Sequence, residues 1–180
     1  FNRNHFLELM DAAAERAVNA GQPSALAYIR VDRYAGLQGE IGLAGIDLLL
    51  TDLTGLLRAH FAADTQLARF GDDVFAALLP GQTPEQCEDS LAALLKKVEG
   101  HMFDVNGRTV QTSLSIGVAG LSEKTAKAQA VIDRAHRCAD ELAEGNALKL
   151  FNPADELAAA ANRGNLLAMV QQALENNSFR

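Results

Sequence analysis

Apolar residues recur along the chain at two spacings. Spacings of three and four residues predict amphipathic helices, whereas short, nearly continuous apolar runs predict strands. We expect helices over residues 4–20, 46–57, 84–99 and 124–143, with a further helix beginning near residue 153. We expect strands over residues 25–31, 103–105, 109–119 and 147–151, two more within residues 66–80, and a polar, glycine-dotted turn over residues 36–45.

Local turn and capping signals support these boundaries. Residues 71–73 (GDD) and 106–107 (NG) are turn sequences between apolar runs, so each predicts a hairpin. Thr83, followed by Pro84 and by Gln86, predicts a capped helix start. Helices that alternate with strands and hairpins favour an α/β (α+β) sandwich with a mixed central sheet.

Composition excludes several classes of protein. The 180-residue chain has 48% hydrophobic residues and a formal charge of −7, which excludes a disordered tail and argues against an extended nucleic-acid surface. No apolar run is long enough to span a membrane. Cys87 and Cys138 fall on apolar helical stripes, so we interpret both as buried hydrophobes in a protein of the reducing cytoplasm.

The chain divides into a domain and an appendage. We expect one domain over residues 1–151 and an appended helix over residues 152–180, with apolar residues along one side of that helix. The sequence starts at Phe1 without methionine and reaches Arg180 without a helix stop signal. We therefore expect it to be a piece of a longer protein.

The strongest candidate for chemistry is the tip of the first hairpin. The sequence has no phosphate-binding loop, no dinucleotide-binding glycine fingerprint, no nucleophile elbow and no HExxH motif. At the hairpin tip, Asp72 and Asp73 are adjacent, and two carboxylates on a tight turn can ligate Mg²⁺. Glycine and aspartate are also the residues that tight turns prefer, so spacing alone leaves both interpretations open.

Four stretches of the chain show a family likeness. FNRNHF (residues 1–6) is similar to the end of an LTGLxNRRxF segment, and IRVDRYAGLQGEIGLAGIDLLL (29–50) matches LDIDxFKxINDxxGHxxGDxxL without a gap. RFGDDVF (69–75) stands where R[YF]GGDEF is expected, and SIGVA (115–119) is identical to a strand of the same family. In order and spacing, residues 1–151 resemble the GGDEF domain, the diguanylate cyclase module that makes cyclic di-GMP from two GTP molecules. The resemblance implies a ferredoxin-like nucleotidyl-cyclase fold, with a mixed, mostly antiparallel sheet flanked by helices.

Departures from the family pattern determine the functional expectation. The resemblance implies that an active member holds two metal ions with the first acid of its DID strand and the third residue of GGDEF. Here Arg30 occupies the first position and cannot ligate Mg²⁺, whereas Asp73 keeps a carboxylate at the third. We expect these two side chains to form a salt bridge in the vacated metal site. The degenerate motif comprises Gly71, Asp72, Asp73, Val74 and Phe75, so no catalytic residue and no metal site is expected.

Other positions that the resemblance assigns to the nucleotide are also altered. Gln38 replaces the guanine-reading asparagine, while Asp47 and Gly71 are kept, so these three residues would form a vestigial nucleotide site. In the late helix, Asp140 stands where a phosphate-binding lysine is expected. Residues 62–65 (AADT) replace the RxxD signature of product inhibition, so binding of cyclic di-GMP is not expected there.

We therefore expect a catalytically inactive GGDEF domain that needs no cofactor and serves a regulatory or protein-interaction role in the cytoplasm. The final QQALENNSFR resembles the connector to an EAL domain in GGDEF–EAL tandem proteins, and the likeness to FimX-type tandem proteins implies a role in type IV pilus twitching motility. Expected partners are the adjacent EAL domain, regulatory proteins and, as one option, a second copy, but not nucleic acid. Two alternatives stay open: a GTP-binding allosteric module, based on Gln38 and Asp47, and a weakly active cyclase.

Overall fold

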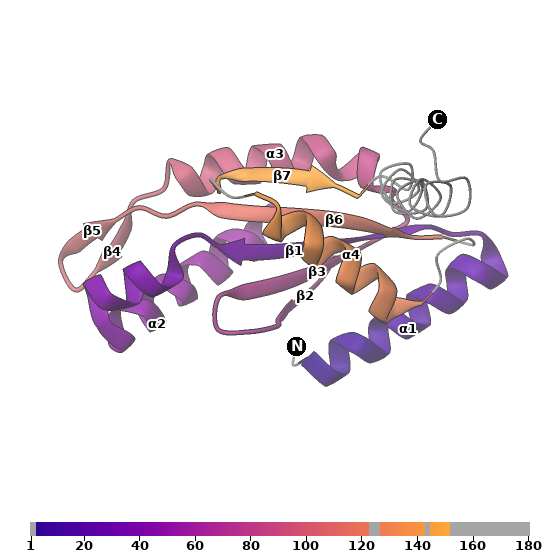
Figure 1. The fold of residues 1–180 in the computed structure, drawn as a ribbon, viewed down its shortest axis with the longest axis horizontal. Helices are drawn as coiled ribbons and strands as arrows, with labels where there is room; N and C mark the ends of the chain where they lie inside the picture. The colour runs from indigo at the N-terminus through magenta and orange to yellow at the C-terminus, as the bar shows by residue number, and fades with distance from the viewer. Residues whose placement is uncertain (1–2, 123–126, 143–144, 152–180) are drawn as a thin grey trace, which may run out of the picture.

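The structure, a computed structural model, describes residues 3–122, 127–142 and 145–151. In these residues a five-stranded sheet lies between helices, and a two-stranded sheet extends from one end of the molecule (Figure 1). The helices are α1 (Arg3–Ala20), α2 (Tyr34–His60), α3 (Pro84–Glu99) and α4 (Ala128–Asp140). The strands are β1 (Ser24–Val31), β2 (Gln66–Arg69), β3 (Val74–Pro80), β4 (Phe103–Val105), β5 (Arg108–Val110), β6 (Leu114–Leu121) and β7 (Ala147–Leu150).

The large sheet has the strand order β2-β3-β1-β6-β7. The central strand β1 pairs antiparallel with β3 on one side and with β6 on the other, so that Ile29 lies between Phe75 and Ile116. Only the pairing of β6 with β7 is parallel among the described strands. The predicted mixed, mostly antiparallel sheet flanked by helices is therefore confirmed.

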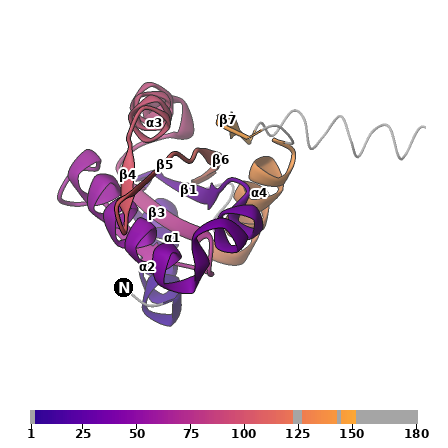
Figure 2. The same ribbon diagram turned by 90° about the vertical axis from the view of Figure 1, so that its left-hand side faces the viewer.

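Different helices cover the two faces of the sheet, as the view in Figure 2 shows. Successive side chains of a strand point to opposite faces. Ile29 of β1 is buried in a cluster with Leu53 of α2 and Leu91 of α3, whereas Leu26 is buried with Met10 of α1 and with residues of α4. The two clusters form two hydrophobic cores, one on each side of a shared sheet.

Two local signals of the sequence are confirmed in atomic detail. The Thr83 hydroxyl accepts a hydrogen bond from the Gln86 N–H at 3.4 Å, and the Gln86 side chain accepts one from the Thr83 N–H at 2.8 Å, which is a capping box at the start of α3. Asn106 and Gly107 both have positive φ, at 54° and 83°, as the two-residue turn between β4 and β5 requires.

The predicted turn over residues 36–45 is wrong, because these residues belong to α2. Leu37 is buried and Ile41 packs against the same core, so this glycine-rich segment has an apolar side to bury. Burial therefore outweighs the poor helix propensity of its glycines. The helix is nevertheless kinked at one of these glycines, Gly42, where φ is 74° and ψ is 177°.

The single strand predicted over residues 109–119 is also wrong. The chain forms β5 up to Val110, leaves strand geometry over residues 111–113, and starts β6 at Leu114. The two halves belong to different sheets, because β5 pairs with β4 and β6 pairs with β1. Apolar alternation does not reveal a change of pairing partner, so the sequence alone could not separate them.

The remaining expectations fall partly outside the described residues. Cys87 and Cys138 are both buried, as predicted. The helix predicted over 124–143 is described from Ala128 to Asp140, and the appended helix over 152–180 lies beyond the described residues. Among the described helices, none is long and apolar enough to cross a membrane.

Candidate functional site

The tip of the β2–β3 hairpin, residues 71–73, is a closed turn. Arg69 donates from Nε to the Gly71 carbonyl at 3.1 Å and from Nη2 to the Asp72 carbonyl at 2.6 Å, while the Phe70 N–H donates to the Val74 carbonyl at 2.8 Å. Asp72 is exposed and Asp73 is half-buried, whereas Val74 is buried as the first residue of β3. The Asp-rich tip therefore has the geometry of a hydrogen-bonded turn.

The hairpin tip lies beside the end of β1. Arg30 is opposite Val74 in the β1–β3 register, and the Val31 N–H donates to the Asp73 carbonyl at 2.8 Å. A pocket of about 440 Å³ opens here, lined by Arg30, Val31, Asp32, Arg33, Tyr34, Ala35, Asp72, Asp73, Leu142 and Gly145. The structure thus brings together Arg30 and Asp73, which the family resemblance places at the metal ions, and Asp72, which it places beside the phosphates.

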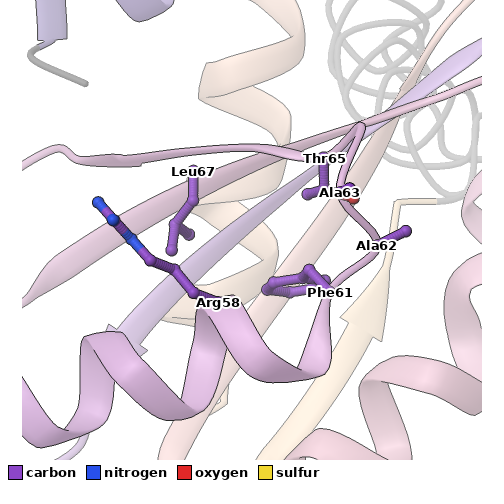
Figure 3. Close-up of a pocket in the computed structure, with 6 residues that line it drawn as sticks. All are labelled: Arg58, Phe61, Ala62, Ala63, Thr65 and Leu67. Atoms are coloured by element: carbon purple, nitrogen blue, oxygen red, sulfur yellow. The ribbon is translucent and has the colours of Figure 1, made fainter.

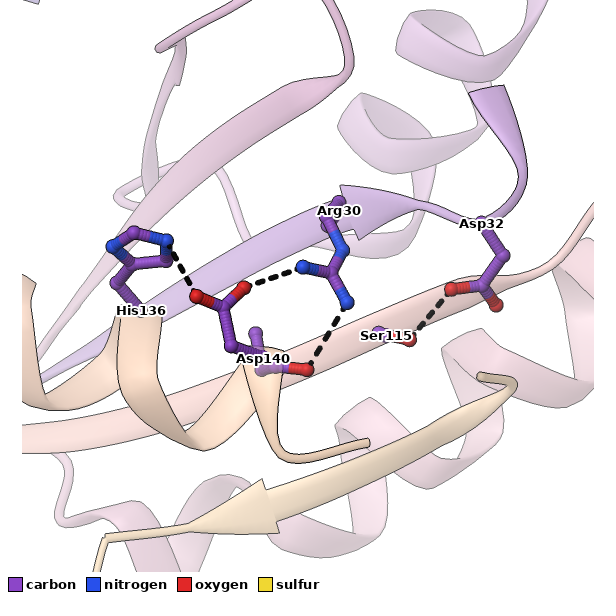
Figure 4. Close-up of polar contacts among 6 residues, drawn as sticks. Arg30, Asp32, Ser115, His136 and Asp140 are labelled. Carbon is purple, nitrogen blue, oxygen red and sulfur yellow. Dashed lines mark hydrogen bonds and ion pairs between the residues drawn. The ribbon is translucent and has the colours of Figure 1, made fainter. Parts of the chain in front are cut away.

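Arg30 forms its ion pair with Asp140 of α4, not with Asp73 (Figure 4). Because Arg30 lies two residues from Tyr28 along β1, it shares the α4 side of the sheet with it. One Arg30 nitrogen bonds the Asp140 carboxylate, and Nη2 also donates to the Ala139 carbonyl at 3.3 Å. The expected salt bridge between Arg30 and Asp73 is therefore wrong, because α4 presents a carboxylate and its last carbonyls on the side to which Arg30 points.

The ion pair is part of a larger contact between β1 and α4. His136 Nε2 lies 2.9 Å from the second Asp140 oxygen, one helical turn away. The His136 ring stacks on Tyr28 with a centroid distance of 4.9 Å. Burial raises the pKa of the Tyr28 phenol, and the carboxylates of Asp140 and Asp73 shift it in the same direction. Tyr28 is therefore a neutral ring packed against His136 of α4.

Both members of this ion pair have the opposite charge from the one that the family resemblance assigns to their positions. Arg30 stands where a metal-binding acid is expected, and Asp140 stands where a phosphate-binding lysine is expected. The structure shows that the two changed residues contact each other. The ion pair therefore joins two positions that the resemblance assigns to a metal ion and to a phosphate.

Asp32 is a residue of this site that sequence reasoning missed. It is only 9% exposed, and its carboxylate accepts hydrogen bonds from the Ser113 hydroxyl at 2.6 Å, the Ser115 hydroxyl at 2.5 Å and the Asn146 N–H at 2.8 Å. The signal that could have found it is its place directly after an apolar strand, since a buried acid needs hydrogen-bond donors. Nothing in the sequence indicates which distant donors these are.

The proposed vestigial nucleotide residues are not gathered in one pocket. Gln38 is half-buried in the first part of α2, whereas Asp47 is exposed beyond the Gly42 kink. Of the residues described here, neither belongs to the lining of the 440 Å³ pocket, and Gly71 lies at the exposed hairpin tip next to it. Recognition of guanine by Gln38 and Asp47 stays a prediction.

The residues beside Arg30 do not fit a pair of magnesium ions. Mg²⁺ prefers oxygen ligands, and two such ions need several carboxylates around them. Here Arg30 contributes a cation, Val74 is apolar and buried, and the Asp32 oxygens already accept three hydrogen bonds. Within the described residues, no group of three or more His, Cys, Asp and Glu side chains could hold a metal ion.

A second pocket lies between the end of α2 and the start of β2 (Figure 3). Its volume is about 340 Å³, and it is lined by Arg58, Phe61, Ala62, Ala63, Thr65 and Leu67. This lining includes three of the residues 62–65 that replace the RxxD signature, and Arg58 is its only charged member. The expectation that cyclic di-GMP does not bind here remains untested.

Comparison with known proteins agrees with the resemblance read from the sequence. A sequence model of the family described as "Diguanylate cyclase, GGDEF domain" matches residues 1–147. Among solved structures, the GGDEF domain of FimX from Pseudomonas aeruginosa is 58% identical, with a TM-score of 0.80 over 83% of this chain and 93% of that one. The expected nucleotidyl-cyclase fold and the likeness to FimX are thereby confirmed.

Two curated relatives are more distant. The probable diguanylate cyclase DgcE of Escherichia coli is 26% identical over 134 residues, which make up 74% of this chain and 12% of DgcE. The bifunctional diguanylate cyclase/cyclic di-GMP phosphodiesterase MucR of P. aeruginosa is 25% identical over 118 residues, 66% of this chain and 17% of MucR. The chain therefore spans less than a fifth of the length of either relative.

Proposed function

We propose that this chain, which belongs to the GGDEF domain family, is a member without cyclase activity that acts as a regulatory, protein-binding module. The observation that carries the proposal is the ion pair between Arg30 and Asp140. It places a guanidinium, already bonded to a carboxylate, where the family pattern has a metal-binding acid. The repulsion between a guanidinium and Mg²⁺ opposes the entry of a metal at this position.

The changes at the hairpin tip also oppose metal binding and catalysis. Val74 replaces a glutamate by a buried apolar side chain that can neither ligate a metal nor transfer a proton. Asp72 replaces a glycine by an exposed carboxylate, which repels a triphosphate. Each lost or opposing charge contact costs several kcal/mol of transition-state stabilisation. A loss of about 1.4 kcal/mol corresponds to a tenfold decrease in rate. Together the changes reduce turnover below detection.

The regulatory role is proposed for a cyclic di-GMP signalling protein of the cytoplasm that controls twitching by type IV pili. The 58% identity to the FimX GGDEF domain supports this assignment. The similarity to MucR, whose name combines a cyclase with a phosphodiesterase, supports a following EAL domain reached through residues 152–180. The proposed partners are that EAL domain, a regulatory protein and a second copy of the chain.

Incubation with GTP tests the absence of catalysis. Purified chain is incubated with GTP and Mg²⁺, and separately with Mn²⁺, and the nucleotides are separated by chromatography. An active diguanylate cyclase in the same buffer serves as the control. We expect no cyclic di-GMP above the level of a protein-free sample. Product that increases in proportion to the concentration of this chain refutes the proposal.

Calorimetry then separates the regulatory alternatives. The chain is titrated with GTP and with cyclic di-GMP, with and without Mg²⁺. We expect no heat of binding from either nucleotide, which leaves the protein-binding module. Heat with GTP that disappears in a Gln38→Ala, Asp47→Ala double variant supports instead a GTP-binding allosteric module.

A further inference from the structure

The buried carboxylate of Asp32 joins three segments that are far apart in the sequence. Asp32 directly follows β1, and Asn146 directly precedes β7. Ser113 directly precedes β6, and Ser115 is the second residue of that strand. We name these four residues the Asp32 network. Oδ1 accepts from the Ser115 hydroxyl (Figure 4), whereas Oδ2 accepts from both the Ser113 hydroxyl and the Asn146 N–H.

The turn that precedes β7 is shaped around this carboxylate. Gly145 and Asn146 both have positive φ, at 73° and 47°. A Cβ at Gly145 would lie 2.5 Å from Asp32 Oδ2, so only glycine lets the backbone pass this close. The Asn146 side chain also bonds the Glu99 carboxylate of α3. The start of β7 is therefore attached to β1 and α3 as well as to its neighbour β6.

Strand β7 depends on such attachments because it is a short edge strand. It has four residues, pairs with β6 on one side only, and all four of its residues are half-buried. Short edge segments with little burial open locally at low free energy. The opposite edge strand, β2, also has four residues and pairs with β3, and the three donors to the Asp32 carboxylate come from other segments.

We infer that the carboxylate of Asp32 controls whether β7 stays on the sheet, and that it connects the pocket beside Arg30 to the end of the domain. Asp32 and Gly145 both line that pocket, so an occupant contacts both sides of the network. β7 is the last described strand before residues 152–180. This inference deepens the proposed regulatory role and rests on it for its biological meaning.

The chemistry of the hydrogen-bond donors explains why loss of the Asp32 carboxylate affects β7 most. The two serine hydroxyls can rotate and find another partner, whereas the backbone N–H of Asn146 has a fixed direction. A hydrogen bond to a charged group is about twice as strong as one between neutral groups. Loss of the carboxylate therefore weakens the attachment of β7 more than the pairing of β1 with β6.

Hydrogen exchange of the whole chain tests the inference. In an Asp32→Ala variant we expect the amides of Ala147–Leu150 to exchange roughly tenfold faster or more, while those of the internal control β2 change little. Ser115→Ala is the matched control, because it removes one bond of the same carboxylate and leaves the Asn146 contact in place. In this control, the ratio of the β7 exchange rate to the β2 exchange rate should stay within about threefold of the ratio in the unmodified chain.

A second variant reaches the network without changing Asp32. Gly145→Ala forces a Cβ against the carboxylate and should also accelerate β7 exchange selectively. Its control is Gly81→Ala, since Gly81 has a similar φ of 71° but lies outside the network. If Asp32→Ala does not fold, Gly145→Ala alone decides the question.

Equal acceleration of β7 and β2, or unchanged β7 exchange, in the folded variants overturns the inference. None of these measurements involves GTP. A negative exchange result would therefore overturn this inference without bearing on the proposed absence of catalysis. Formation of cyclic di-GMP would refute the proposed absence of catalysis and leave the exchange result standing.

Discussion

Arg30 of β1 and Asp140 of α4 form an ion pair although 110 positions separate them in the sequence. The pair lies where the family pattern has an acid and a lysine, with the two charges exchanged. The pair joins the end of the central strand to the end of α4. It also places a fixed cation where the resemblance puts a metal-binding carboxylate, which is the observation on which the proposed absence of cyclase activity rests.

The Arg30–Asp140 pair should be energetically coupled. In a double-mutant cycle with Arg30→Ala and Asp140→Asn, we expect a coupling of about 0.5–1 kcal/mol in the free energy of unfolding, since Arg30 is only 29% exposed. The more exposed pair of Arg108 and Glu40, at 56% and 50%, is the control and should couple more weakly. Urea denaturation measures both cycles. Zero coupling for Arg30 and Asp140 contradicts the assignment of a stabilising contact.

Gly117 should be needed for the docking of α4 on the sheet. A Cβ at this position would lie 1.9 Å from the Ala135 carbonyl oxygen and 2.6 Å from the Ala139 nitrogen, both in the α4 backbone. We expect Gly117→Ala to lower the free energy of unfolding by about 2–3 kcal/mol or more, because backbone atoms cannot rotate away. Thermal or urea unfolding provides the measurement.

Gly55→Ala is the matched control for that substitution. Gly55 lies in α2, and a Cβ there meets nothing within 4 Å. We expect this change to raise stability by about 0.5–1 kcal/mol through helix propensity. Similar effects of the two substitutions would mean that α4 does not lie as close to β6 as described.

The thiol of Cys87 should make stability fall at alkaline pH. Burial, with a smaller contribution from Glu85, raises its pKa from an ordinary 9.0 to about 11. Between these values the unfolded chain loses the proton while the folded chain keeps it, so the free energy of unfolding decreases as pH rises, by at most about 2–3 kcal/mol. Urea denaturation across this pH range measures the decrease.

A Cys87→Ala variant isolates the contribution of the thiol. It has lower stability at neutral pH because a buried side chain is shortened, but its stability should lose less between pH 9 and about 11. Parallel pH profiles for the variant and the unmodified chain would show that the thiol does not ionise differently on unfolding.

The capping box of α3 should contribute measurably to stability. Thr83→Ala removes the hydroxyl that accepts from the Gln86 N–H, and we expect a loss of about 1 kcal/mol. Thr51→Ala in the interior of α2 is the control, where alanine is the better helix former and the change should be neutral or slightly stabilising. An equal response of both threonines in urea denaturation would argue against a specific cap.

Local sequence was a reliable guide where the structure depends on neighbouring residues. The capped start of α3 at Thr83 and the turn at Asn106-Gly107 follow from the backbone requirements of those few positions, and both are confirmed. The same reasoning failed over residues 36–45, because the glycine content that suggested a turn was outweighed by the burial of Leu37. Burial depends on what packs against a segment, and local sequence does not show that.

The sequence by itself determined the mixed sheet, the family and the altered charges at Arg30, Asp72 and Val74, because these depend on residue identity and on short-range periodicity. Only the tertiary structure decided which partners those residues have. Arg30 contacts Asp140 instead of Asp73, and Asp32 joins Ser113, Ser115 and Asn146, because strand alternation and helix packing bring distant side chains to one face of the sheet. Contacts between residues 81 to 114 positions apart are set by packing, which no local pattern encodes.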